Sequence, residues 1–135
     1  MKLVIIDGQG GRLGSLLTEE IKRANLPCEI TAIGTNSIAT AAMLKAGADY
    51  AATGENPVVV TCRDADVIVG PIGIIAADSL LGEVTPAMAL AVGQSKAAKL
   101  LVPVNRCHMT VVGVSPLSMA ELVKETVGRL KTLCE

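Results

Sequence analysis

Three glycines near the start of the chain have the spacing of a loop that binds phosphate groups. They follow the apolar run at residues 3–6 and precede an amphipathic segment, so they are expected between a strand and a helix. In such a loop the glycines permit a tight turn, close approach of a pyrophosphate, and close packing of the helix on the strand. Amide groups at the helix N-terminus and the helix dipole then favour an anion. The candidate binding residues are Gly8, Gln9, Gly10, Gly11, Arg12, Leu13 and Gly14.

The second strand departs from the pattern of dinucleotide-binding loops. The glycines match G-x-x-G-x-x-G, and an acidic residue that binds the ribose hydroxyls is then expected about 20 residues past the loop. The sequence there has Thr35, Asn36 and Ser37, which either bond a ribose or phosphate or cap the next helix. NAD or NADP is therefore the expected cofactor class, with a mononucleotide or another phosphorylated ligand left open. Alternatively, the loop is a tight turn that needs glycines for packing alone.

Other candidate residues follow the later strands, whose carboxyl ends meet at one edge of a parallel sheet. Arg106 could clamp a phosphate or carboxylate, because a guanidinium donates two parallel hydrogen bonds. His108 is either an acid/base group or an exposed loop side chain, and Asp7 is a second acid/base candidate. The further binding residues expected at this edge are Gly70, Pro71, Ile72, Gly73, Asn105 and Arg106.

The stretch between Gly70 and Gly93 carries two charges, Asp78 and Glu83, among apolar and small residues. Two carboxylates can support acid/base chemistry, but capping of a helix around residues 79–82 is the preferred interpretation. A helix expected at residues 85–98 is apolar on nearly all sides, and such a helix is normally buried. We therefore expect a homodimer through the 72–93 region; the alternative is cover by a loop or by the C-terminal helix of the same chain.

Apolar runs suited to buried strands alternate with helical segments along the whole chain. Strands are expected at residues 3–6, 29–33, 48–52, 67–69, 100–104 and 110–114, and helices at residues 11–24, 37–46, 57–63, 85–98 and 118–133. Residues 57–63 are assigned to a helix because they lie between two parallel strands, although three consecutive valines favour a strand. The alternation predicts an α/β fold: a Rossmann-like, doubly wound parallel sheet with three α/β/α layers and strand order 3-2-1-4-5-6.

Composition excludes several classes of protein. The 135 residues, of 13.8 kDa, fit one domain, and the net charge of -1 with one aromatic residue argues against a nucleic-acid partner. The four cysteines lack metal-binding spacing, so we expect no metal and free thiols in a reducing cytoplasm. No signal peptide and no apolar run long enough to span a bilayer are found, so no membrane partner is expected.

Five segments resemble a short bacterial family of uncharacterised proteins, domain of unknown function 3842. The segments are IDGQGG (residues 6–11), GTNS (34–37), ATGEN (52–56), GPIGI (70–74) and PVNRC (103–107). Together they span nearly the whole chain. The resemblance implies a Rossmann-like fold and assigns no activity to any residue.

Three functions are consistent with these features. The first is a small cytoplasmic protein that binds a nucleotide or dinucleotide at residues 8–14, because the glycines lie between a strand and a helix. The second is a small enzyme that acts on a phosphorylated or carboxylated metabolite, using Arg106 with Asp7 or His108. The third is an interaction module without a small ligand. Binding or sensing is favoured over hydride transfer, because 135 residues leave no room for a substrate domain.

Overall fold

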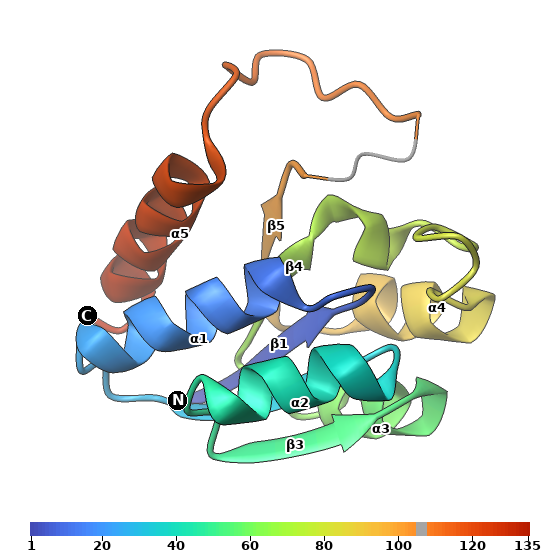
Figure 1. The fold of residues 1–135 in the computed structure, drawn as a ribbon, viewed down its shortest axis with the longest axis horizontal. Coiled ribbons are helices and arrows are strands. Elements are labelled where there is room, and N and C mark those ends of the chain that lie inside the picture. The colour runs from blue at the N-terminus through green and yellow to red at the C-terminus, as the bar shows by residue number, and fades with distance from the viewer. Residues whose placement is uncertain (105–107) are drawn as a thin grey trace.

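A five-stranded parallel sheet forms the centre of the molecule, with the strands in the order β3-β2-β1-β4-β5 (Figure 1). The computed structural model describes residues 1–104 and 108–135. The strands are β1 (Lys2–Asp7), β2 (Glu29–Gly34), β3 (Tyr50–Thr53), β4 (Val67–Pro71) and β5 (Ala98–Val102). The helices are α1 (Arg12–Arg23), α2 (Ser37–Lys45), α3 (Glu55–Cys62), α4 (Pro86–Gln94) and α5 (Met119–Leu133), with a short 3-10 helix, η1 (Ile72–Ile75).

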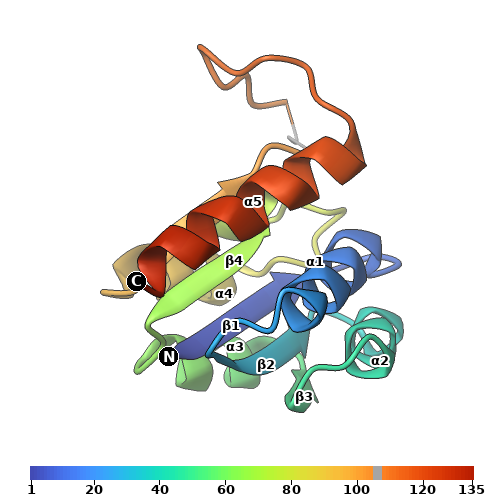
Figure 2. The same ribbon diagram turned by 90° about the vertical axis from the view of Figure 1, so that its left-hand side faces the viewer.

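Helices cover both faces of the sheet, as Figures 1 and 2 show. Alternate residues of β1 point to opposite faces, so Leu3 and Ile5 pack with α1, α2 and α5, whereas Val4 and Ile6 pack with α3 and α4. The chain changes face at α3, which carries it from β3 back across to β4. The predicted doubly wound, three-layer arrangement is therefore confirmed. The switch point lies between β1 and β4, where ligands of such folds bind.

Local signals in the sequence explain where the helices begin. The Thr85 side chain accepts a hydrogen bond from the Met88 amide, and Pro86 is the first residue of α4. Ser118 and Glu121 form a capping box at the start of α5. The helix predicted at residues 57–63 is confirmed as α3; because it crosses the sheet, it buries Val58 and leaves other positions exposed.

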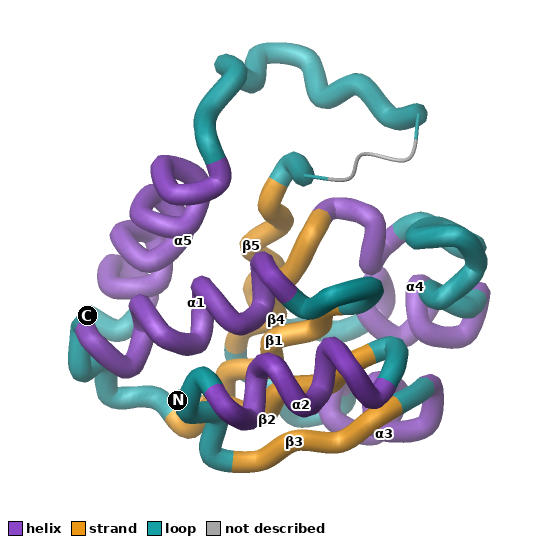
Figure 3. The backbone as a smooth tube through the Cα atoms, viewed as in Figure 1, coloured by secondary structure: helices purple, strands orange, loops and turns teal. Residues whose placement is uncertain are grey.

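Two predicted elements are wrong. Residues 110–114 form no strand: they belong to the loop that leads to α5, drawn in teal in Figure 3. Gly113 is in the left-handed region at φ 85° and Val112 is 93% exposed, so the run neither continues as extended chain nor buries a face. Helix α4 ends at Gln94 rather than residue 98, because β5 already begins at Ala98 and pairs with Val67 of β4.

Among the described residues, Cys28, Cys62 and Cys134 carry unpaired thiols. Burial raises the pKa of the Cys62 thiol to about 11, so this group stays uncharged at neutral pH. Cys107 lies outside the described residues. Within residues 1–104 and 108–135, no helix is long and apolar enough to cross a membrane.

Candidate functional site

The predicted glycine loop, residues 8–14, lies between β1 and α1. It turns back on itself through a hydrogen bond from the Gly11 amide to the Gly8 carbonyl, at 2.9 Å. Gln9 and Gly11 adopt left-handed backbone angles, with φ of 50° and 71°. Gly11 is also the N-cap of α1, so the loop delivers the chain directly into the first turn of that helix.

The glycines of the loop have different roles. A Cβ added to Gly14 would lie 2.9 Å from the Asp7 Cβ, which confirms that this glycine allows α1 to pack closely on β1. A Cβ at Gly11 would lie 2.7 Å from the Ala39 Cα, so this position serves the packing of α1 against α2. A Cβ at Gly10 would meet nothing within 4 Å, and the residue is exposed. Gly10 is therefore where a ligand can approach the backbone.

The Asp7 carboxylate holds the two ends of the loop together. One oxygen accepts a hydrogen bond from the Gly8 amide at 2.8 Å, and the other accepts one from the Gly14 amide at 2.7 Å. Asp7 is 5% exposed, and burial raises the pKa of its carboxyl group; the two backbone hydrogen bonds oppose this rise and the charge of Glu83 adds to it. The contacts explain the burial of this carboxylate by a structural role.

Several amides of the loop have no hydrogen-bond partner in the described part of the chain. They belong to Gly10 and to the first two residues of α1, Arg12 and Leu13. The Leu13 side chain packs in the core, whereas Arg12 is exposed. Unpaired amides at a helix N-terminus, reinforced by the helix dipole, form a position that favours an anion.

Glu83 reaches this loop from the turn before α4. Its Oε1 atom accepts hydrogen bonds from the Gln9 amide at 2.8 Å, the Thr35 hydroxyl at 2.7 Å and the Asn36 side-chain amide at 2.6 Å. The interpretation of Glu83 as a helix cap is wrong, because residues 79–82 form turns and its carboxylate binds groups far away in sequence. The signal that could have singled it out is its charge within an apolar stretch.

Thr35 and Asn36, at the end of β2, are brought to the glycine loop, while Ser37 is the exposed first residue of α2. Asn36 Oδ1 accepts a hydrogen bond from the Ala39 amide at 2.9 Å, which confirms the alternative that this side chain caps a helix. Its Nδ2 also donates to the Gln9 carbonyl at 2.9 Å. The cap residue is thus part of the wall of the loop as well.

The other predicted site residues divide into described and undescribed ones. Gly70 and Pro71 end β4, and a Cβ at Gly70 would collide with the Ile6 carbonyl oxygen of β1. Ile72 and Gly73 follow in η1, so this segment lies at the switch point beside the first strand. Asn105, Arg106 and Cys107 lie outside the described residues, and the expected roles of Asn105 and Arg106 stay predictions. His108 is an exposed residue of the loop before α5.

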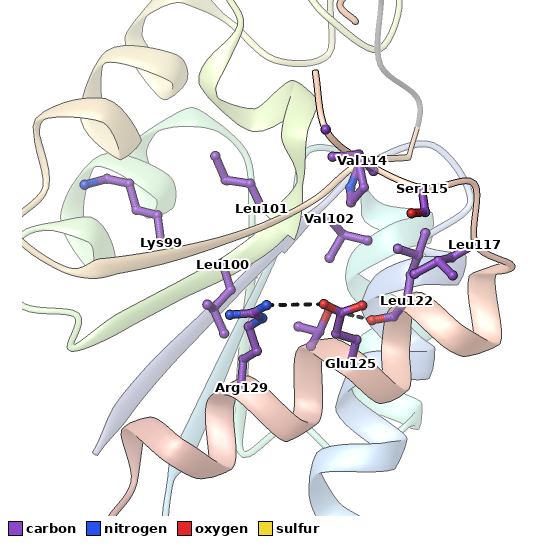
Figure 4. Close-up of a pocket in the computed structure, with 13 residues that line it drawn as sticks. Lys99, Leu100, Leu101, Val102, Val114, Ser115, Leu117, Leu122, Glu125 and Arg129 are labelled. Carbon is purple, nitrogen blue, oxygen red and sulfur yellow. Dashed lines mark hydrogen bonds and ion pairs between the residues drawn. The ribbon is translucent and has the colours of Figure 1, made fainter. Parts of the chain in front are cut away.

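A separate cavity of about 450 Å³ lies between β5 and α5 (Figure 4). Leu100 and Val102 project from the strand toward the helix, and an exposed Glu125–Arg129 ion pair with a separation of 3.4 Å lines the helix side. None of its lining residues belongs to the glycine loop. The cavity is therefore a different feature from the candidate anion site.

Comparisons with known proteins agree with the resemblance found in the sequence. A family model described as "Domain of unknown function (DUF3842)" matches residues 2–135. No curated protein matches the chain. Among solved structures, the chain is similar to a dodecameric FMN-dependent UbiX-like decarboxylase from Escherichia coli O157:H7, with a TM-score of 0.44 and 16% identity over 98% of this chain and 93% of that one.

Proposed function

This chain belongs to the family with domain of unknown function DUF3842, and we propose that it binds a nucleotide or dinucleotide through a phosphate group on the glycine loop. The observation that carries the proposal is the set of unpaired amides at Gly10, Arg12 and Leu13. They lie at the start of α1 at the switch point of a doubly wound sheet, where anionic ligands are bound. NAD or NADP is the proposed ligand class, with mononucleotides as the simplest members to test.

The contacts of Asp7 favour binding over acid/base catalysis on a metabolite. Each of its carboxylate oxygens accepts a backbone hydrogen bond, so abstraction of a substrate proton would require one of these bonds to break. His108, the other acid/base candidate, is exposed in the loop before α5. The enzyme hypothesis keeps Arg106 as its clamp, and this residue lies outside the described part of the chain.

We also propose that the protein forms a homodimer through the 72–93 region. Within this region Leu81 is 97% exposed, Leu90 is 58% exposed and Ile75 is 40% exposed. On the inner side of α4, Met88 and Val92 are buried against α3 and the sheet, so α4 presents an apolar outer surface in the isolated chain. A second copy that covers these side chains would remove them from water.

A calorimetric titration of the purified protein with NAD⁺, NADP⁺, AMP and FMN tests the proposed ligand class. The informative variant is Gly10→Val, because its side chain enters open space in front of the loop and disturbs no neighbour. Gly128→Val in α5 is the matched control, since that glycine is also exposed with nothing within 4 Å of an added Cβ. We expect at least one nucleotide to bind the parent and the control, and to bind Gly10→Val about tenfold more weakly or not at all.

Two results would contradict the proposal. One is the absence of binding of every nucleotide to the parent protein at millimolar concentration, with the protein folded. The other is equal nucleotide affinity of the parent and of Gly10→Val, which would place any bound nucleotide elsewhere on the molecule.

A further inference from the structure

The inference concerns how the site would treat the ribose of a bound nucleotide, and it rests on the proposed function. A dinucleotide-binding fold places an acidic residue at the end of its second strand, where the carboxylate accepts hydrogen bonds from the ribose hydroxyls. In this chain β2 ends at Gly34, and the next residues are Thr35 and Asn36. The position that should supply a carboxylate therefore supplies only neutral side chains.

The structure fills that place with a carboxylate from another part of the chain. Glu83 Oε1 accepts hydrogen bonds from both Thr35 and Asn36, which follow β2, and from the Gln9 amide of the glycine loop. The acid thus lies between the ends of β1 and β2, beside the unpaired amides of the loop. Its sequence position, after β4, hides it from a motif search that looks past the first helix.

The turn before Glu83 holds it in this place. Leu80, Leu81 and Gly82 have left-handed φ angles of 53°, 56° and 87°, and the Asp78 amide donates to the Val84 carbonyl at 2.7 Å to close the turn. Leu80 is 4% exposed and packs so closely on Gly8 that an added Cβ there would lie 2.9 Å from its Cδ1 atom. The carboxylate is therefore positioned before any ligand arrives.

The carboxylate has unused capacity as a hydrogen-bond acceptor. All three of its hydrogen bonds end on Oε1, and Oε2 has no partner among the described residues. Glu83 is half-buried, so this oxygen can be reached from solvent. Burial by itself would raise the pKa of the carboxyl group, but the hydrogen bonds outweigh it and the pKa is lowered, so the group is charged at neutral pH.

We propose that Glu83 is the ribose-binding acid of this site and selects nucleotides with an unmodified 2′-hydroxyl over those with a 2′-phosphate. A free diol donates hydrogen bonds to a carboxylate oxygen, whereas a 2′-phosphate brings negative charge against negative charge and has only acceptors to offer. The described residues beside Glu83 at this position, Thr35 and Asn36, carry no positive charge to offset that repulsion.

The test compares two ligands that differ by one phosphate group, NAD⁺ and NADP⁺, on the parent protein and on Glu83→Gln. Glutamine has the same shape and keeps an acceptor oxygen for Gln9, Thr35 and Asn36, so the loop should remain folded; the melting temperature checks this. Glu55→Gln is the control, because it removes one charge from an exposed residue after β3 that is outside this hydrogen-bond group.

The parent and Glu55→Gln should bind NAD⁺ about tenfold more tightly than NADP⁺, and Glu83→Gln should lose most of this preference by weakening NAD⁺ and improving NADP⁺. If Glu83→Gln strengthens both ligands equally, the carboxylate competes with the ligand for the loop and the assignment is wrong. If NAD⁺ and NADP⁺ bind the parent equally and Glu83→Gln changes neither, the nucleotide site stands and the role of Glu83 fails. If the parent binds no nucleotide, the proposed function fails and the assignment fails with it.

Discussion

Asp7 and Glu83 belong to one hydrogen-bonded group around the glycine loop but lie in opposite environments. Asp7 is buried, and burial raises the pKa of its carboxyl group; Glu83 is half-buried, and its hydrogen bonds lower the pKa. The first carboxylate therefore acts on the fold, whereas the second keeps its charge and one free oxygen where a ligand can reach it. This division of roles at the residue scale leads to two predictions.

Replacing Asp7 by asparagine should destabilise the protein. The asparagine oxygen can accept from one of the two amides, Gly8 or Gly14, but its NH₂ group would then face the other N–H. We expect the free energy of unfolding to fall by about 1–3 kcal/mol, as for other buried donors left without an acceptor. Urea denaturation measures the change, and an unchanged midpoint would show that Asp7 does not hold the loop.

Glu83 should make the stability depend on acid pH. Its carboxyl pKa is lowered in the folded protein, so the folded state prefers the ionised form more strongly than the unfolded chain does. This contribution is present above the ordinary value of 4.5 and is lost as the pH falls through the folded-state pKa. Between about pH 6 and pH 3, the melting temperature of the parent should fall more steeply than that of Glu83→Gln. Parallel curves would contradict the hydrogen bonds assigned to this carboxylate.

At the scale of elements, the glycine loop joins two jobs that neighbouring glycines perform separately. Gly11 allows α1 and α2 to approach each other, and Gly10 leaves the front of the loop open. The sequence pattern predicts that both kinds of position exist, but it does not say which glycine has which role. Only the placement of Ala39 on α2 reveals it.

The two glycines should therefore respond differently to the same substitution. Gly11→Val places a side chain against the Ala39 backbone at a φ of 71°, and should cost on the order of 3 kcal/mol of unfolding free energy. Gly10→Val meets open space and should change stability by less than about 0.5 kcal/mol. Urea denaturation of the two variants checks this; equal losses would mean that the loop is packed differently.

Most elements could be predicted because their signals are local. Strand composition, the caps at Thr85 and Ser118, and alternation along the chain are enough to place five strands and five helices. The strand expected at residues 110–114 fails because β-branched residues do not make a strand without a partner and a buried face. Glu83 escapes prediction for a similar reason, since its contacts with Gln9, Thr35 and Asn36 are set by the tertiary fold.

At the scale of the whole molecule, the apolar outer side of α4 predicts a homodimer. Leu90→Lys should break it, because the charge would be buried in the interface. Ile38→Lys is the matched control: Ile38 is 69% exposed on α2, which lies on the opposite face of the sheet. In sedimentation equilibrium the parent and Ile38→Lys should have twice the chain mass, and Leu90→Lys should have 13.8 kDa. A parent mass of 13.8 kDa would remove the dimer.

The most direct test of the proposed nucleotide site is an NMR titration of ¹⁵N-labelled protein with NAD⁺. Each backbone amide except those of proline gives its own signal, so the spectrum reports which amides the ligand contacts. The account predicts the largest and saturable shifts at Gln9, Gly10, Arg12 and Leu13, with little change in the cavity between β5 and α5. Shifts confined to the Leu100–Val102 and Leu122–Arg129 segments that line the cavity, or no shifts at all, would contradict it.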